Sequence, residues 1–123
     1  MGYIVKPDPD QDMYVEWSRN LGEPVACGNR AEMLRILHGD PGASDRFDTP
    51  ERRLARADEL GSSSRVPGEG WWGHDEFPYG YKGMLARKDL VRAVELLAAG
   101  RDDEVLALLA PFDDDEDNTE EAE

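Results

Sequence analysis

The sequence is poor in the side chains on which catalytic and metal centres most often depend. Its 123 residues include one cysteine and two histidines. A single thiol, Cys27, allows no disulfide within a monomer, and two histidines with one distant cysteine are a poor set of zinc ligands. No serine lies in a G-x-S-x-G sequence, and no glycine run has the spacing of a phosphate-binding loop. We therefore expect no cofactor and no metal site.

Long apolar runs and targeting segments are also missing. No stretch reaches the roughly 18 consecutive apolar residues that a membrane span needs. The first ten residues, MGYIVKPDPD, lack the basic region and apolar run of a signal peptide. Lys6 stands where a myristoylation signal requires serine or threonine. We expect a soluble, cytoplasmic protein that does not bind membranes.

Positive charge is scarce, with 14 lysines and arginines against 28 acids and a net charge of −14. Eight of the acids lie in residues 113–123, and without them the net charge becomes −6. We predict one domain at 1–112 and an acidic, disordered tail at 113–123, because the tail has almost nothing to bury. This charge disfavours direct binding to nucleic acid or anionic lipid and suits a basic protein partner.

The N-terminal part has the pattern of a β-hairpin followed by a third strand. Residues 3–5 form an aromatic and β-branched run, and residues 7–12 have the proline and aspartate content of a turn. Residues 13–18 then alternate between apolar and polar side chains, as a strand with one buried face does. A short strand at 25–27 follows and ends at Gly28.

Four helices are predicted, at about 30–38, 50–60, 87–99 and 103–110. Asn29 and Glu32 have the spacing of a capping box before the first helix. The resulting order is β-β-β-α-α-β-α-α. We predict an α+β fold in which a small, mostly antiparallel sheet, made of the N-terminal hairpin and one or two further strands, packs against these helices on one face. Residues 62–70 have the composition of a flexible connection.

Residues 68–83 (GEGWWGHDEFPYGYKG) form an aromatic segment that contains five of the ten aromatic residues. Phe77, Tyr79 and Tyr81 recur at every second position, as on one face of a strand. Pro78 cannot donate to a ladder, so we expect an edge strand that pairs with the N-terminal hairpin.

The adjacent tryptophans, Trp71 and Trp72, are the strongest sign of a binding surface. In a strand they would point to opposite faces, so one can enter the core while the other is exposed. Core filling explains one tryptophan better than two, and aromatic residues are common anchors of protein interfaces. The candidate partner-binding residues are Trp71, Trp72, His74, Phe77, Tyr79 and Tyr81.

Two other patterns resemble metal or catalytic sites. Asp8, Asp10 and Asp12 have the D-x-D-x-D spacing of a calcium loop, but the glycine and glutamate of an EF-hand are absent, which favours a simple turn. His74, Asp75 and Glu76 could form an acid/base or metal cluster, and Cys27 could act as a nucleophile beside His74. An exposed loop and a buried thiol are the favoured interpretations.

Arginines gather on the second predicted helix and just after it, at Arg52, Arg53, Arg56 and Arg65. They could contact a phosphate, an acidic partner or the acidic tail, although a solvated helix surface paired with nearby acids is the simpler interpretation.

The leading hypothesis is a small acidic protein-binding module, such as an adaptor, inhibitor or immunity-type factor, that docks on a basic partner through its aromatic segment. The excess of arginine over lysine and the alanine, glycine and aspartate content indicate a bacterial or phage origin. One alternative is a nucleic-acid mimic that acts against a host defence system. The other is an enzyme of unknown class with a site built from Cys27, His74, Asp75 or Glu76. The oligomeric state stays open.

Overall fold

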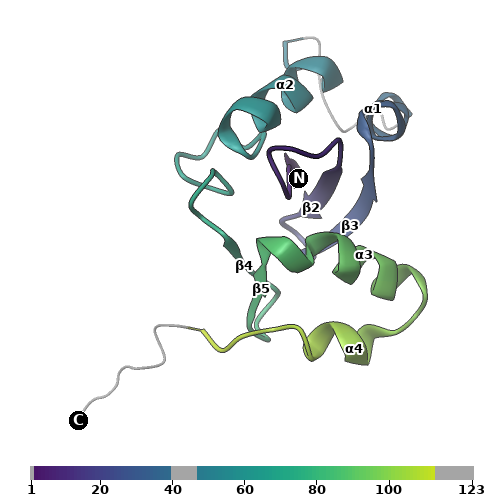
Figure 1. Cartoon of the computed structure of the whole chain (residues 1–123), viewed down its shortest axis with the longest axis vertical. Helices are drawn as coiled ribbons and strands as arrows, with labels where there is room; N and C mark the ends of the chain where they lie inside the picture. The colour runs from purple at the N-terminus through teal and green to yellow at the C-terminus, as the bar shows by residue number, and fades with distance from the viewer. Residues whose placement is uncertain (1, 40–46, 113–123) are drawn as a thin grey trace.

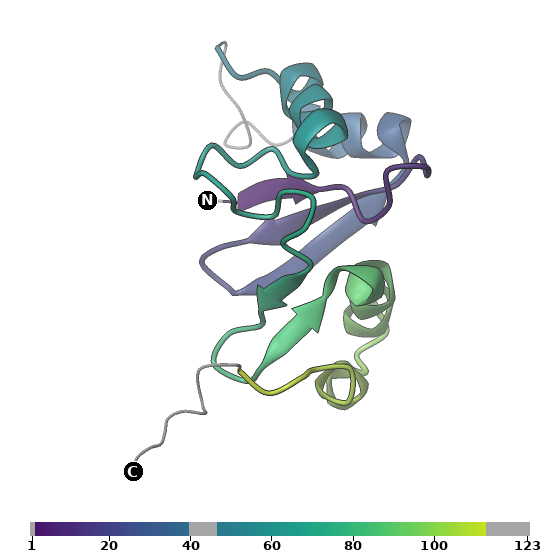
Figure 2. The ribbon, with the colours of Figure 1, turned by 60° about the vertical axis from the view of Figure 1, so that its left-hand side comes forward.

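A three-stranded antiparallel sheet lies at the centre of the molecule in the computed structural model, which describes residues 2–39 and 47–112 (Figure 1). Its strands are β1 (Gly2–Val5), β2 (Tyr14–Ser18) and β3 (Glu23–Gly28), in the order β1-β2-β3. The two helical layers lie on opposite sides of this sheet, with α1 and α2 on one side and α3 and α4 on the other (Figure 2). The predicted tail at 113–123 lies outside the described residues.

Strand register explains why the sheet has two apolar faces. Tyr3 pairs with Trp17 and Val5 pairs with Val15, so these four side chains point to the same face. Ile4, between them in sequence, points to the other face and is fully buried there. Because three consecutive apolar residues in β1 must all be covered, the sheet needs a packing layer on each side.

The first layer consists of α1 (Arg30–His38) and α2 (Pro50–Leu60), and both helices begin where the sequence predicts. Asn29 and Glu32 form the expected capping box, and the side chain of Thr49 accepts a hydrogen bond from the amide of Arg52. The helices cover Ile4 and Tyr14 of the sheet. Their own buried residues in this cluster are Met33, Leu37, Leu54 and Ala57.

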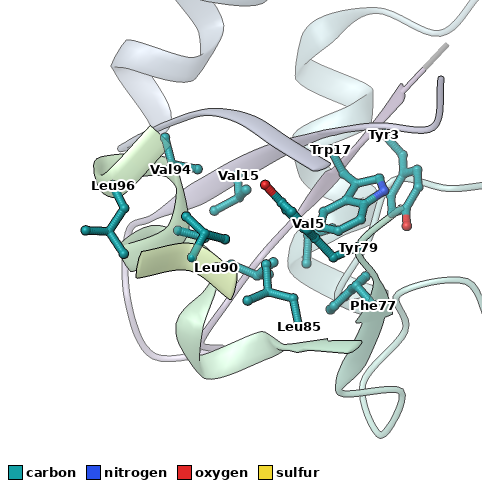
Figure 3. Packing of buried hydrophobic residues seen from close by; sticks show 12 residues of the cluster. Tyr3, Val5, Val15, Trp17, Phe77, Tyr79, Leu85, Leu90, Val94 and Leu96 are labelled. Atoms are coloured by element: carbon teal, nitrogen blue, oxygen red, sulfur yellow. The ribbon is translucent and has the colours of Figure 1, made fainter. Parts of the chain in front are cut away.

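The second layer contains a small two-stranded sheet and two helices. Strands β4 (Glu76–Pro78) and β5 (Met84–Ala86) pair with each other, and a 3-10 turn, η1 (Arg87–Asp89), leads into α3 (Leu90–Ala98) and α4 (Asp102–Leu106). None of the described helices has the length and apolar character needed to cross a bilayer. Figure 3 shows the larger core cluster, where side chains of β1, β2, β4, β5 and α3 meet.

The predicted fold class, α+β with a small antiparallel sheet, is confirmed, and the structure corrects three details. The order is β-β-β-α-α-β-β-α-α, since β5 adds a strand. The helices cover both faces of the sheet instead of one. The strand at Phe77 pairs with β5, not with the N-terminal hairpin, because glycines at positions 80 and 83, both with positive φ, allow the chain to turn back at once.

The segment after α2 also differs from its expected form as a flexible connection. Ser62, Ser63 and Ser64 are buried. The Ser63 amide donates to the carbonyl oxygen of Ile4 at 2.8 Å, and the Ser63 hydroxyl accepts from the Ile4 amide at 2.8 Å. This segment therefore lies along the outer edge of β1 and covers backbone groups that an edge strand would otherwise expose.

Candidate functional site

Arg87, the first residue after β5, holds the aromatic segment in its conformation. Its nearly buried guanidinium donates hydrogen bonds to five backbone carbonyl oxygens, those of Lys6, Gly61, Gly70, Trp71 and His74. Its Nε also donates to Oδ1 of Asp75 at 3.0 Å. Burial lowers the pKa of Arg87, while the hydrogen bond and charge of Asp75 act in the opposite direction.

The two tryptophans are both partly exposed, and each contacts a different part of the protein. Trp72 packs against the end of α2, where its Nε1 donates to the carbonyl oxygen of Glu59 at 3.2 Å. The guanidinium of Arg87 lies 4.9 Å from the Trp72 ring centroid, a cation–π distance. The Nε1 atom of Trp71 is buried, and no described residue accepts a hydrogen bond from it. Trp71 therefore offers a partner only part of its ring.

Phe77 and Tyr79, two of the six predicted binding residues, belong to the core. Phe77 is 2% exposed and Tyr79 is 6% exposed. The Phe77 ring packs against Trp17 with 5.4 Å between centroids, beside Tyr3 (Figure 3). Aromatic residues recur at every second position here because Phe77 and Tyr79 point to the same face of the chain, and this face completes the core. Tyr81 continues the period in sequence but lies in the turn after β4, and it is fully exposed, at 101%.

A groove of about 680 Å³ lies between the β2–β3 turn, the loop before β4, and the β4–β5 turn. Its floor includes the covered rings of Tyr3, Trp17 and Phe77. Leu21 and Tyr81 stand on opposite turns beside it, and Leu21 is 63% exposed. An aromatic floor with exposed apolar side chains at the rim is typical of a recognition groove.

One wall of the groove contains an ordered polar network. Arg19 Nη2 lies 2.5 Å from Oε1 of Glu69 and 3.0 Å from the hydroxyl of Ser64, and its guanidinium stacks 4.8 Å from the ring centroid of Tyr3. Burial disfavours the ionised form of Glu69, but hydrogen bonds from Arg19 and Ser64 outweigh this and lower its pKa. The network fixes the β2–β3 turn to the loop that precedes the aromatic segment.

A second hollow, of about 590 Å³, adjoins the first. Trp72, Pro7 and Pro9 supply its apolar walls, and Glu76 belongs to the lining of both hollows. Glu76 is exposed, and no ion pair to it occurs within residues 2–39 and 47–112. The Glu76 carboxylate therefore stands where the two hollows meet, without an ion pair to any described residue.

The structure distributes the predicted binding residues unevenly around these hollows. His74, Phe77 and Tyr81 line the larger groove, and Trp72 lines the smaller hollow. Strands β1 and β2 and the β2–β3 turn supply another part of the groove lining, which the sequence pattern did not assign to the site. The sequence holds one signal for them, because Leu21 is a large apolar residue within a turn, where a polar residue is expected.

Cys27, the candidate nucleophile, lines neither of the two hollows. Cys27 packs against the main core, and burial, followed by the charges of Glu95 and Glu32, raises the pKa of its thiol, which keeps it protonated at neutral pH. Within the part of the chain that the structure describes, no three or more histidine, cysteine, aspartate or glutamate side chains are placed to hold a metal ion.

The aspartates of the first turn serve its backbone. Asp8 Oδ1 accepts from the amide of Asp10 at 2.8 Å, and Asp12 Oδ1 accepts from the amide of Arg30 at 2.8 Å. These are the local contacts of an Asx turn and of a link to α1.

The arginines of α2 do not form one solvated basic surface. Arg53 is buried, contrary to the expectation that it lies on the outer face of the helix. Arg56 is partly buried and contacts both carboxylate oxygens of Asp48, at 2.9 and 3.0 Å. Arg56 Nε also donates to the carbonyl oxygen of Ser63 at 2.8 Å. The positive charges of Arg53 and Arg56 therefore point into the protein, where the two side chains stabilise the fold around α2.

Comparison with known proteins finds no relative: no family model matches the chain, and no curated protein or solved structure is significantly similar to it.

Proposed function

We propose that this protein is a small acidic binding module of bacterial or phage origin that acts in the cytoplasm as an adaptor, inhibitor or immunity-type factor. It docks on a basic protein partner through the groove between the β2–β3 and β4–β5 turns. The observation that carries the proposal is the pair Leu21 and Tyr81, two large side chains left in solvent on either side of an aromatic-floored groove. Burying such side chains against a partner releases free energy that the isolated fold does not use.

Partial exposure of Trp72 supports a binding role for the hollow that adjoins the groove. Trp72 lines the adjoining hollow and is already held by Arg87 and α2, so little side-chain entropy would be lost when a partner covers it. Pre-ordered aromatic anchors of this kind contribute more affinity than mobile ones. Leu21 and Tyr81 therefore make the central contacts with the partner, and Trp72 and His74 make the outer ones.

Charge supports a basic partner. The net charge of −14 attracts a positively charged protein over a distance of about a Debye length, roughly 8 Å at physiological salt. A nucleic-acid mimic would instead need unpaired carboxylates on a rigid surface. Several carboxylates of the folded part pair with arginine or lysine, namely Asp48, Asp58, Glu69, Asp75, Glu95 and Glu104. Because these carboxylates are paired, they support the nucleic-acid mimic hypothesis less than they support the binding-module hypothesis.

The test is affinity capture from the native host with wild-type protein and with the double variant Leu21→Ala/Tyr81→Ala, followed by titration of the purified partner. We expect the double variant to bind at least about 100-fold more weakly, since two anchors are worth roughly 3 kcal/mol together. Leu106→Ala, which trims a partly exposed leucine on α4, is the matched control and should bind like wild type. A captured partner that binds the double variant as tightly as wild type would refute the docking surface.

A further inference from the structure

We propose that the bound segment of the partner is an extended chain that adds as a strand to the free edge of β4, with a lysine or arginine beside Glu76 and an apolar residue on each side of it. This inference rests on the proposed function and specifies the chemistry of its ligand. It follows from the backbone of β4, from the direction of its side chains, and from the one carboxylate shared by the two hollows.

The hydrogen-bonding pattern of the small sheet leaves one edge of β4 open. Phe77 pairs with Leu85, the amide of Tyr79 donates to Gly83 at 2.8 Å, and the amide of Arg87 donates to Asp75 at 2.7 Å. Backbone groups at alternate positions of a strand point in opposite directions, so those of Glu76 and Pro78 face away from β5. Within the described residues, β4 has no strand partner on that side.

The groove borders this open edge. Glu76, Pro78 and Gly80 all line it, and the amide of Gly80 donates to the carbonyl oxygen of Gly22 at 3.0 Å, which closes one end. Beyond that hydrogen bond, the amide and carbonyl of Glu76 and the carbonyl of Pro78 point away from β5, and no strand of residues 2–39 and 47–112 pairs with them. Pro78 removes one donor only, so the edge still offers the backbone groups that strand addition uses.

The side chains of β4 specify the sequence of the incoming strand. Glu76 and Pro78 are exposed, whereas Phe77 points to the core and contributes to the groove floor. A residue that pairs with Glu76 places its side chain on the same exposed face, where a lysine or arginine meets the carboxylate. Its two neighbours point to the opposite face, toward the aromatic floor. The pattern expected is therefore apolar–basic–apolar.

A second copy of this chain is a poor occupant of the same edge. Two β4 edges would bring Glu76 side chains and two proteins of net charge −14 together, which like-charge repulsion disfavours. Pro78 would also deprive each strand of a donor. A basic segment of another protein meets neither obstacle.

The first experiment is selection of random heptapeptides displayed on phage against the immobilised full-length protein, in parallel with Glu76→Lys and Asp103→Lys. Glu76 has no ion pair to lose among the described residues, so its substitution should leave the fold intact, which a thermal melt checks. Asp103 is an exposed acid on α4, outside both hollows, and its replacement makes the same charge change.

We expect wild type and Asp103→Lys to enrich peptides with a lysine or arginine between two apolar residues. Glu76→Lys should enrich an aspartate or glutamate at that position and should bind the wild-type peptide about tenfold more weakly. In the complex, hydrogen exchange at the amide of Glu76 should slow, while that of Gly73 should not change. No enrichment, a consensus without a basic residue, the same consensus on Glu76→Lys, or an unprotected Glu76 amide would each overturn the inference.

The outcomes separate this inference from the proposed function. If a captured partner depends on Leu21 and Tyr81 but the selected peptides show no basic residue, the binding module stands and the strand-addition model falls. If the partner ignores Leu21 and Tyr81 as well, both fall.

Discussion

The amide of Gly80 donates a hydrogen bond of 3.0 Å to the carbonyl oxygen of Gly22 and so joins the two turns that border the groove. The two backbones approach closely there, because a Cβ built on Gly22 would lie 2.9 Å from the Gly80 nitrogen. One turn belongs to the central sheet and the other to the small sheet (Figure 2). The shape of the groove therefore depends on a contact that only glycine at position 22 permits.

Gly22→Ala should destabilise the protein for two reasons. The φ of Gly22 is 67°, in the left-handed region, where alanine costs about 1 kcal/mol. The new methyl group would also collide with Gly80. We expect a loss of at least about 2 kcal/mol in the free energy of unfolding, measured by urea denaturation.

Gly100→Ala is the matched control for the collision. Gly100 has a φ of 73°, but a methyl group at this position would have no described residue within 4 Å. The free energy of unfolding of this variant should therefore fall only by the backbone contribution of about 1 kcal/mol. Equal losses in the two variants would show that the Gly22–Gly80 contact adds nothing to stability.

Arg87→Lys should destabilise the protein although it keeps the charge. Lysine has three donors at one point, whereas the guanidinium of Arg87 reaches five carbonyl oxygens and Asp75 from a planar fork. Buried carbonyls left without donors should reduce the free energy of unfolding by about 3 kcal/mol. The tryptophan emission should also shift, because Arg87 stacks on Trp72.

The exposed Arg92 on α3 offers the control, since Arg92→Lys makes the same substitution where the ion pair to a described residue is a 3.9 Å contact with Glu95. A loss of stability in Arg87→Lys no larger than in Arg92→Lys would contradict the role assigned to Arg87.

Local signals explain why the helices and strands could be predicted. Asn29 and Glu32, Thr49 before Pro50, and Gly61 mark helix ends through contacts within a few residues, and the structure shows these contacts. The alternation in β2 reflects burial of Val15 and Trp17 on one face, but Tyr14 on the other face is buried as well, beneath α1 and α2, so the prediction of a single buried face was wrong. Where the physical cause lies within one turn or one strand, the sequence contains it.

The groove could not be predicted because its causes are long-range. Arg87 is 81 residues from Lys6 in sequence, and nothing near Arg87 indicates that its side chain binds the Lys6 carbonyl together with carbonyls of the glycine-rich loop before β4. The sequence also predicted one binding role for five aromatic residues that the structure separates. Phe77 and Tyr79 fill the core, the tryptophans are partly covered, and Tyr81 alone is fully exposed.

Stability should fall in acid because two carboxyls are more acidic in the folded protein than in the unfolded chain. Burial raises the pKa of Asp58, but hydrogen bonds from Lys6 and Tyr14 outweigh it and the net shift is downward, as for Glu69. A carboxyl with a lowered pKa stabilises the folded protein when the pH is above its unfolded-state pKa, which is near 4.5 for glutamate. This stabilisation is lost as the pH falls through the pKa of the same carboxyl in the folded protein.

Glu69→Gln tests this pH dependence, because the amide keeps the shape of the carboxyl but cannot ionise. We expect its free energy of unfolding to fall less steeply than that of wild type as the pH is lowered from about 5 to about 3. Parallel curves for the two proteins across this range would show that the Arg19–Glu69 pair contributes no pH-dependent stability.

Deletion of residues 113–123 should slow association with a basic partner without changing the lifetime of the complex. Residues 113–123 hold eight acids. They follow directly after the segment in which Ala110 pairs with Met84 of β5. Strands β4 and β5 form the small sheet, and this sheet supplies one wall of the groove. Charges outside the contact surface act mainly on the association rate constant, which should fall several-fold at low salt and converge with wild type near about 0.5 M salt, where the screening length is only about 4 Å. Stopped-flow kinetics with the captured partner would measure both rate constants.

A faster dissociation of the complex with the truncated protein would mean instead that the tail contacts the partner in the complex, as a nucleic-acid mimic requires.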